Sequence, residues 1–295
     1  MSRGRRPLPS YEGPDRLWLQ ETLSAPKEGL KLPRITVVTP SFNQARFLEE
    51  TLRSVLLQRY PDLEYLVLDG GSTDQSVAII ERYAEHLAHW TSERDGGQSA
   101  AIAKGFSMAT GEVLCWLNSD DALLPGALLR VGSEFAKQPD LGVVYGNRLV
   151  VDENGRQLGA TYPPFYLTQS SWAQGQSVAQ ESTFWKTEVY RRVGGLDVSK
   201  FFAMDYDLFA RLWAAATARK VRARLGVIRV HGDAKSSKYE EIMWREFRES
   251  KRALGIPDLP AWQARLVSRI NREQSRFERV LDRSLAAIDR LRGSL

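Results

Sequence analysis

Two acidic loops, each directly behind an apolar segment, constrain the fold of this chain more than any other feature. One apolar segment ends in Asp69-Gly70-Gly71-Ser72-Thr73-Asp74, and the other ends in Asn118-Ser119-Asp120-Asp121. Apolar runs of this length are typical of strands buried on both faces of a parallel sheet. Open α/β sheets bind ligands at the carboxyl ends of their strands, so both loops are expected at a ligand site. Asp120 and Asp121 are adjacent like charges, and we expect a divalent cation with oxygen ligands to offset their repulsion.

Length and composition are those of a globular protein. A chain of 295 residues can form one large domain, with or without extensions. No stretch approaches the roughly 18 uncharged apolar residues of a membrane span. The basic N-terminus is not followed by an apolar run, so no secretory signal is expected. The one cysteine, Cys115, lies inside an apolar segment, which indicates core packing and agrees with a reducing cytoplasm.

The chain is basic, with a formal net charge of +5 and a sequence pI of about 9.3. An arginine-rich solvated surface explains this charge, and so does attraction to anions such as nucleotide diphosphates or lipid headgroups. Charge is the only feature that suggests nucleic acid, so no nucleic-acid partner is expected.

Strands alternate with helices from Arg34 onward, which predicts βαβ units and an α/β fold. A Pro-, Gly- and charge-rich segment precedes them, and a helical pattern follows them. We therefore expect an N-terminal tail or strap over residues 1–33, a central domain over 34–237 and a helical extension over 238–295. His86 and His89 are expected one turn apart on a helix in a structural role. The predicted strands cover residues 35–39, 63–69, 113–117, 142–145, 149–151, 183–185 and 227–230, and the predicted helices 46–58, 75–87, 99–109 and 125–137.

The last part of the helical extension carries an apolar stripe at 3-and-4 spacing between many charged residues. Three roles are open for it: packing against the central domain, self-association, or contact with a membrane surface. The stripe consists of Val267, Ile270, Gln274, Phe277, Leu281, Ser284, Ile288 and Leu291.

Four short motifs occur along the chain in a characteristic order. They are Thr39-Pro40-Ser41-Phe42-Asn43, the loop beginning at Asp69, the loop beginning at Asn118, and Met204-Asp205-Tyr206-Asp207. Together they resemble the family 2 nucleotide-diphospho-sugar glycosyltransferases over roughly Pro33 to Ser237. The resemblance implies the GT-A fold, a Rossmann-like and mainly parallel sheet flanked by helices, here with a C-terminal helical extension.

The resemblance also implies an activity. Such enzymes transfer a sugar from a nucleotide-diphosphate donor to a hydroxyl of a glycan or lipid-linked acceptor, with inversion and with Mn²⁺ or Mg²⁺. A UDP-sugar is the favoured donor. The corresponding setting is cell-envelope polysaccharide biosynthesis in the cytoplasm, and both a peripheral contact with the inner membrane surface and a homo-oligomer through the C-terminal helix are left open.

By resemblance, Thr39, Pro40 and Asp69 hold the donor nucleoside together with Asp120. Asp120 and Asp121 are the implied metal ligands, with His231 as a further one. The division of ribose and metal roles between the two aspartates is open. For Asp69 and Asp74 the alternative is that they only cap the following helix.

Asp205 corresponds to the family's catalytic base, although Met204 stands where relatives carry Glu. The alternative for Asp205 is a helix N-cap. Gln180, Glu181 and Trp185 resemble the acceptor-side segment, since aromatic faces stack on sugars and amides bond hydroxyls. The alternative for Trp185 is core packing.

Two other functional classes fit parts of the pattern. A scaffold protein could keep the nucleotide fold without turnover, but the intact set of Asp120, Asp121 and Asp205 disfavours it. A nucleotidyltransferase on a similar fold would need a basic, Gly-rich triphosphate loop after the first strand, and the sequence has none there.

Overall fold

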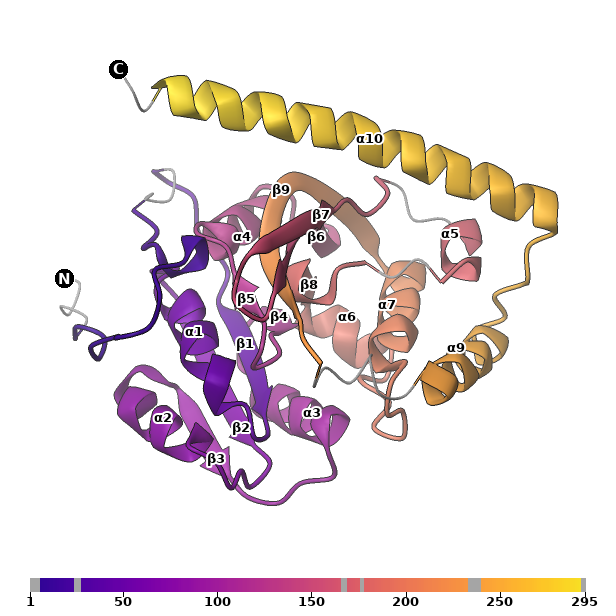
Figure 1. The fold of residues 1–295 in the computed structure, drawn as a ribbon. Coiled ribbons are helices and arrows are strands. Elements are labelled where there is room, and N and C mark those ends of the chain that lie inside the picture. Colours follow the sequence, from indigo (N-terminus) through magenta and orange to yellow (C-terminus); the bar gives the residue numbers. More distant parts are fainter. Residues whose placement is uncertain (1–5, 24–27, 166–168, 176–177, 233–239, 293–295) are drawn as a thin grey trace.

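The computed structural model describes residues 6–23, 28–165, 169–175, 178–232 and 240–292. A twisted central sheet is covered by helices on both faces, and a long C-terminal helix crosses one side of the domain (Figure 1). The extension contains α9 (Glu240–Ala253) and α10 (Ala261–Arg292). No helix within the described ranges has the length and apolar character needed to cross a membrane.

The described strands form one sheet in the order β3-β2-β1-β4-β8-β6-β9-β5, with β7 beside β6. β3, β2, β1 and β4 are parallel to one another, whereas β8 runs antiparallel to β4 and β6, and β9 runs parallel to β6 and antiparallel to β5. The expected α/β fold is confirmed, with its parallel part concentrated in the N-terminal half. The strands are β1 (Ile35–Ser41), β2 (Leu63–Asp69), β3 (His89–Ser92), β4 (Val113–Trp116), β5 (Ala122–Leu123), β6 (Leu141–Asp152), β7 (Gln157–Thr161), β8 (Thr183–Lys186) and β9 (Thr217–Val230).

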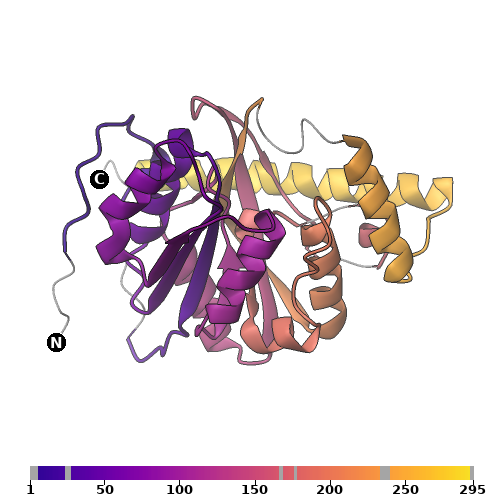
Figure 2. The same ribbon diagram turned by 90° about the horizontal axis from the view of Figure 1, so that it is seen from below.

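Alternation along the strands sends side chains into two separate cores, because successive residues of a strand point to opposite faces. In β4, Val113 and Cys115 join the core under α1 (Ala45–Leu56), α2 (Ser76–Tyr83) and α4 (Ala127–Lys137). Leu114 and Trp116 join the core under α3 (Gln98–Met108), α6 (Thr187–Arg192) and α7 (Met204–Ala215). Figure 2 shows the helices on either side of the sheet.

Two details differ from the sequence expectations. His89 begins β3 while His86 ends a 3₁₀ turn, so the two histidines do not share a helix. The strands expected at residues 142–145 and 149–151 are one continuous strand, β6, because both segments pair with β9. The pairing of β8 between β4 and β6 is long-range and leaves no local sequence signal.

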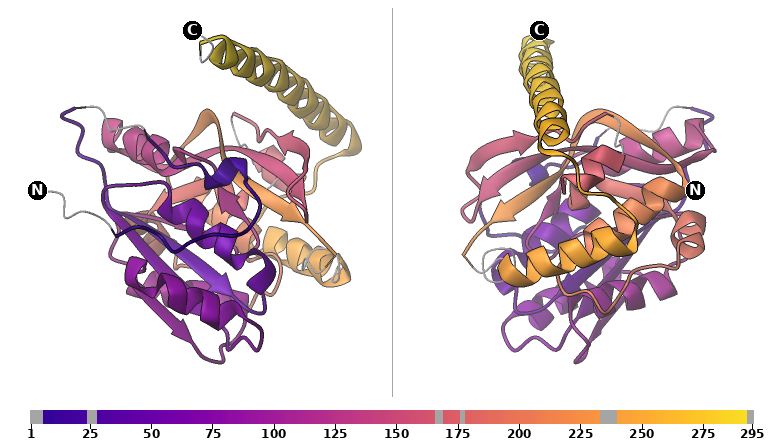
Figure 3. Two further views of the ribbon diagram at one scale, coloured as in Figure 1. Left: turned by 60° about the vertical axis from the view of Figure 1, so that its left-hand side comes forward. Right: turned by 90° about the vertical axis from the view of Figure 1, so that its right-hand side faces the viewer.

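The N-terminal segment is a strap that lies beside α1 (Figure 3). Its short 3₁₀ helix, Leu17–Leu19, buries the Trp18 side chain. Thr22 Oγ1 accepts a 2.8 Å hydrogen bond from the backbone N–H of Gly126, and Arg53 donates to the carbonyl oxygen of Pro9. The strap is therefore fixed to the domain at several points.

Candidate active site

The loops that follow β1 and β2 are tied to each other. Asn43 has a positive φ of 51°, and its side-chain oxygen accepts a 2.8 Å hydrogen bond from the backbone N–H of Thr73. In return, Ser72 Oγ accepts a 2.8 Å bond from the Asn43 N–H. Asp74 accepts bonds from the N–H groups of Ala45 and Ser76, which begin α1 and α2. Asp74 thus binds the backbone at the start of both helices, although the N-cap positions themselves are Gln44 and Gln75.

Asp69 is almost fully buried at the end of β2. Its carboxylate accepts hydrogen bonds from the N–H groups of Gly71 and Ser72 and from the hydroxyls of Ser72 and Ser92. Four donors from the chain itself occupy these oxygens, so Asp69 orders the loop. Contact between Asp69 and a nucleoside stays a prediction.

The two other predicted nucleoside residues lie below the surface. The Thr39 side chain is fully buried, with its hydroxyl 3.0 Å from the Tyr65 hydroxyl, and Pro40 is also buried within β1. A side chain that solvent cannot reach does not bind a nucleobase in this conformation. The buried side chains of Thr39 and Pro40 thus support the strand that carries the loop, and contact of these two residues with the nucleoside stays a prediction.

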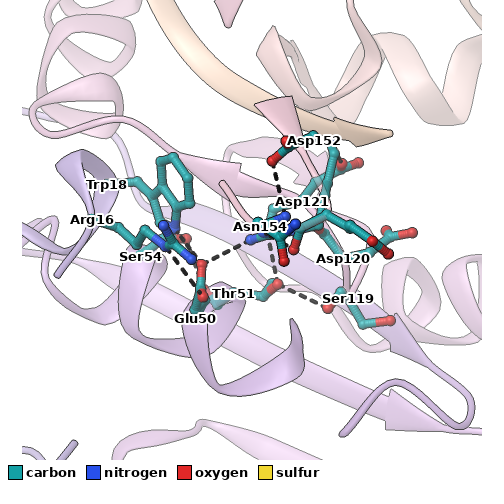
Figure 4. Close-up of polar contacts among 12 residues, drawn as sticks. Arg16, Trp18, Glu50, Thr51, Ser54, Ser119, Asp120, Asp121, Asp152 and Asn154 are labelled. Carbon is teal, nitrogen blue, oxygen red and sulfur yellow. Dashed lines mark hydrogen bonds and ion pairs between the residues drawn. The ribbon is translucent and has the colours of Figure 1, made fainter. Parts of the chain in front are cut away.

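The Asn118–Asp121 loop follows β4 and is held from below by α1. Thr51 Oγ1 donates to the carbonyl oxygens of Ser119, at 2.9 Å, and Asp121, at 2.7 Å (Figure 4). The Asp121 side chain turns inward and is 4% exposed, whereas the Asp120 side chain keeps 20% of its surface accessible. Asp120 is thus the accessible carboxylate of the pair.

His231 follows the end of β9 and meets Asp120. Its Nε2 atom lies 3.0 Å from Asp120 Oδ2, and its ring packs 4.9 Å from the Phe47 ring centroid. The sequence separates the two residues by 111 positions, yet the fold places the imidazole directly on the carboxylate. His231 therefore lies against the acidic loop, and its role as a metal ligand stays a prediction. Lys235 and Ser236, which follow it, lie outside the described residues.

A buried ion pair supports this loop from behind. Arg229 donates from Nη2 to Glu50 at 2.8 Å and from Nε to the Asp120 carbonyl oxygen at 3.0 Å. Its backbone N–H donates to Asp121 Oδ1 at 3.0 Å. Glu50 also accepts a 2.9 Å bond from the Trp18 indole, and Arg16 lies beside it (Figure 4). The strap and the acidic loop are thus joined through one carboxylate, an arrangement that no local motif predicts.

Asp121 lies in a strongly acidic environment. Burial raises the pKa of Asp121 well above its usual range, and the charges of Asp120 and Glu181 raise it further. The hydrogen bonds from Arg229 and Asn118 oppose this shift. A buried carboxylate of this kind changes the electrostatic potential at Asp120 but presents little surface to a ligand.

A chain of amides lines the loop. Gln98 donates to Asn118 at 2.8 Å, Asn118 donates to Gln180 at 3.1 Å, and Gln180 donates to the Trp116 carbonyl oxygen at 2.7 Å. Asn118, the neutral residue at the first motif position, therefore links the start of α3 to the segment before β8. Gln180 is largely occupied by these contacts, and its predicted acceptor role stays a prediction.

Glu181 is 2% exposed, with its Oε2 atom 3.5 Å from Arg148. Its Oε1 atom is buried without a hydrogen-bond partner in the described part of the chain. Trp185 is fully buried among Trp116, Phe106 and Phe209. An indole enclosed in that core cannot stack on an acceptor, so the acceptor role expected for Trp185 is wrong and core packing is correct.

Asp205 lies in the first turn of α7 and is half-buried. Burial raises the pKa of Asp205, and the charge of Glu181 adds to the shift while Arg148 opposes it. Its Oδ1 atom accepts a bond from the next backbone N–H, at Tyr206, and the N-cap position belongs to Ala203. The structure does not give Asp205 the N-cap role.

The turn before Asp205 is fixed by two other elements. Ser99, at the start of α3, donates to the Lys200 carbonyl oxygen at 2.7 Å. Glu246 of α9 accepts hydrogen bonds from the backbone N–H groups of Phe201, Phe202 and Ala203. Although burial alone would raise it, these three donors hold the pKa of Glu246 below its usual range. The C-terminal extension therefore orders the turn before the predicted base, through contacts that leave no local signal in the sequence.

The residues at the loop can supply only some of the ligands that a hard divalent cation needs. Across the described ranges no group of three or more His, Cys, Asp or Glu side chains is arranged to enclose a metal ion. Asp120 is the accessible ligand, with 20% of its side chain exposed, and the buried His231 side chain, 3% exposed, lies 3.0 Å behind it. Mg²⁺ and Mn²⁺ at nucleotide sites commonly take one or two protein ligands and complete their shell with phosphates and water. The pair fits that pattern.

Comparison with known proteins identifies the family of this chain. The profile of glycosyl transferase family 2 matches residues 36–193. The chain therefore belongs to glycosyl transferase family 2, and it is a glycosyltransferase. An uncharacterised glycosyltransferase of Mycobacterium tuberculosis is 29% identical over 61% of this chain and 68% of its own length. Chondroitin synthase of Escherichia coli is 25% identical over 77% of this chain but only 34% of the synthase.

Solved structures show the same fold. Staphylococcus aureus TarS, crystallised with UDP-GlcNAc, has a TM-score of 0.60 at 18% identity, covering 78% of this chain and 69% of that one. The mannosyltransferase PcManGT of Pyrobaculum calidifontis, in complex with GDP-Man and Mn²⁺, has a TM-score of 0.58 at 23% identity, covering 82% and 70%. These likenesses confirm the GT-A fold.

Proposed function

We propose that this chain is an inverting, metal-assisted glycosyltransferase. It transfers a sugar from a nucleotide-diphospho-sugar to a hydroxyl of a glycan or lipid-linked acceptor. In one displacement the acceptor oxygen forms a bond to the anomeric carbon, and the bond from that carbon to the diphosphate oxygen breaks. The acceptor proton passes to Asp205, and the electron pair of the broken bond leaves with the nucleoside diphosphate.

The observation that carries this proposal is a chain of contacts between the acidic loop and the start of α7. Gln98 donates to Asn118 of the loop at 2.8 Å, and the next residue, Ser99, bonds the Met204 sulfur at 2.9 Å. The acidic loop after β4 and the start of α7 therefore border the same region. An inverting transferase needs its catalytic base close to its diphosphate site, because both flank the reacting carbon.

Metal binding is assigned to Asp120 and His231 rather than to Asp121. Asp120 is the accessible carboxylate, and His231 Nε2 lies 3.0 Å from it. When bound, Mn²⁺ or Mg²⁺ supplies charge neutralisation for the departing diphosphate. Asp121 and Arg229 support the loop that presents Asp120.

The donor is a nucleotide sugar, with a UDP-sugar as the favoured choice. TarS and PcManGT, crystallised with UDP-GlcNAc and GDP-Man, share the fold and support this class of donor. The similarity to chondroitin synthase supports an acceptor in polysaccharide biosynthesis at the cell envelope. Gln180 lies beside the acidic loop, where an acceptor or donor hydroxyl could exchange with its present partner.

The test begins with thermal stabilisation by a panel of nucleotide sugars, with and without Mn²⁺, because a ligand that binds only the folded chain raises its melting temperature. We expect one donor to stabilise the chain in a metal-dependent way. That donor should then release its nucleoside diphosphate in the presence of Mn²⁺ and not in excess chelator. Stabilisation without any turnover would support the scaffold alternative, and pyrophosphate release from a nucleoside triphosphate would support a nucleotidyltransferase.

A further inference from the structure

The C-terminal helix α10 leaves an apolar stripe on its outward side. Five large apolar residues there are between 51% and 64% exposed. Their spacing of four, four, seven and three positions places them on one side of a helix of 3.6 residues per turn. We refer to this set as the outer stripe: Trp262, Leu266, Ile270, Phe277 and Val280.

The opposite side of α10 is attached to the domain. Glu278 is buried and accepts a 2.7 Å bond from the Lys220 ammonium group of β9. Ser275 donates to the Tyr162 carbonyl oxygen at 3.3 Å, and Gln174 donates to the Ala264 carbonyl oxygen. The helix is therefore docked by a polar side, and Figure 3 shows it standing along the edge of the molecule.

The exposed apolar residues of α10 differ from the stripe expected from the sequence. Val267 and Gln274 are half-buried on the side toward the domain, whereas Ile270 and Phe277 are exposed. The heptad-like set is thus divided between two sides of the helix. The side chains of Leu281, Ser284, Ile288 and Leu291 lie outside the described residues.

A row of exposed arginines runs beside the outer stripe. Arg265, Arg269, Arg276 and Arg279 each directly precede a stripe residue, and Arg272 continues the row. Since consecutive residues are about 100° apart around a helix, the row flanks the stripe on one side. Among the residues of α10 whose side chains are described, the exposed acid is Glu273, which lies on the stripe side between Ile270 and Phe277 and is paired with Arg276 at 2.8 Å. An apolar stripe bordered by cations is complementary to a surface that is apolar within and anionic outside.

We infer that the outer stripe and its arginine row bind an anionic membrane surface, with α10 lying in the plane of the headgroups. Aromatic residues such as Trp262 and Phe277 suit that interface. A second copy of the chain fits less well, because antiparallel pairing of two outer stripes would place the arginine rows beside each other. This inference concerns attachment, and it does not rest on the proposed reaction.

The experiment is co-sedimentation of the full chain with phosphatidylcholine vesicles, with and without phosphatidylglycerol. The unmodified chain should bind only the anionic vesicles, and added salt should weaken the binding. The triple variant Arg269→Gln, Arg272→Gln, Arg279→Gln should bind roughly a hundredfold more weakly, since each basic residue near the surface contributes about a fivefold factor. The variant Leu266→Ser, Ile270→Ser, Phe277→Ser should also lose binding.

A matched control changes apolar residues that are equally exposed elsewhere, Leu158→Ser with Val198→Ser, and should bind like the unmodified chain. Circular dichroism and donor-induced thermal stabilisation, measured on each variant, report whether the domain stays folded. Equal sedimentation with neutral and anionic vesicles, or none with either, overturns the inference. So does a dimeric mass by light scattering that becomes monomeric in the Ser variant, because a second copy then covers the stripe. Donor stabilisation tests the proposed function independently of these outcomes.

Discussion

The Glu246 carboxylate on α9 accepts a 2.7 Å hydrogen bond from the backbone N–H of Phe202, two residues before the helix that carries Asp205. It also accepts bonds from the N–H groups of Phe201 and Ala203, each at 3.0 Å. Unpaired N–H groups at a helix start carry partial positive charge, which a carboxylate stabilises. A residue of the C-terminal extension thus takes the place of a local capping side chain.

Glu246 is therefore predicted to position Asp205. Glu246→Gln keeps one acceptor oxygen but removes the charge, and it should lower the transfer rate about tenfold while donor affinity stays unchanged. Glu246→Asp, which restores the charge, should recover more of the rate than Gln does. Steady-state kinetics with separate kcat and KM values, together with donor calorimetry, provide the measurement. A loss confined to KM, or an equal loss in the exposed control Glu249→Gln, would count against a positioning role.

The pH dependence of stability offers a second readout of the Glu246 contact. Because the pKa of Glu246 is depressed in the folded chain, its stabilisation is present above the ordinary Glu value and is lost as pH falls through the depressed value. Unmodified chain and Glu246→Gln should therefore differ in unfolding free energy at neutral pH, by about 1 kcal/mol, the usual cost of a lost cap. The difference should disappear well below about pH 4. Denaturant titrations across this range measure it.

Asp205 is predicted to act as the base. Asp205→Asn keeps the size of the side chain but cannot accept a proton, so transfer should fall by about 10²-fold or more with donor and metal binding nearly intact. Because the pKa of Asp205 is raised by burial, the base form is present above that raised value and is lost as pH falls through it. The acid limb of the rate profile should thus lie above the ordinary Asp value of about 3.9. Normal transfer by Asp205→Asn would place the base elsewhere.

The sequence predicted the parallel strands and the acidic loops because both leave local signals. β2 occupies residues 63–69 as predicted, and the apolar run before Asn118 contains β4. The same signals could not give the depth of each side chain. Asp120 and Asp121 are neighbours in the sequence, yet the backbone turn sends one toward the surface and the other into the interior.

The features of the site that the sequence could not predict come from contacts between distant segments. Arg229 and Glu50 are separated by 179 positions, and neither belongs to a motif that suggests the other. Glu246 lies in a helix whose sequence is charged and amphipathic, and this pattern does not indicate a contact with the turn before Asp205. For Trp185, the sequence left open a sugar-stacking role and a core role, because an aromatic residue suits both. Burial among Phe106, Trp116 and Phe209 decided for the core.

Asp120 and Asp121 are predicted to differ in metal dependence. Asp120→Asn removes the accessible ligand beside His231, so Mn²⁺-dependent donor binding should be lost, and donor affinity should equal that of the unmodified chain in chelator. Asp121→Asn keeps an oxygen for the Arg229 N–H bond and removes a buried charge, so it should retain metal-dependent donor binding. Calorimetry with and without Mn²⁺ compares the two variants. Our assignment fails if Asp121→Asn abolishes the metal effect and Asp120→Asn preserves it.

The Arg229–Glu50 pair is predicted to couple the stability of the chain to the acidic loop. Both side chains are more than nine-tenths buried, and loss of one partner leaves the other charge unpaired inside the protein. Glu50→Gln should therefore lower the unfolding free energy by about 3 kcal/mol, at the lower end of the range for a broken buried pair. It should also weaken Mn²⁺-dependent donor binding, because Arg229 holds the Asp120 carbonyl oxygen. The control is Glu49→Gln on the same helix: Gln keeps an oxygen for the Tyr83 hydroxyl and loses only the pair with the half-exposed Arg82, so it should cost less than about 1 kcal/mol. Urea unfolding and donor calorimetry on both variants measure the two effects. Equal losses of unfolding free energy for the two glutamates would contradict the predicted cost of breaking the buried pair. Normal donor binding by a destabilised Glu50→Gln would show that the pair does not support the donor site.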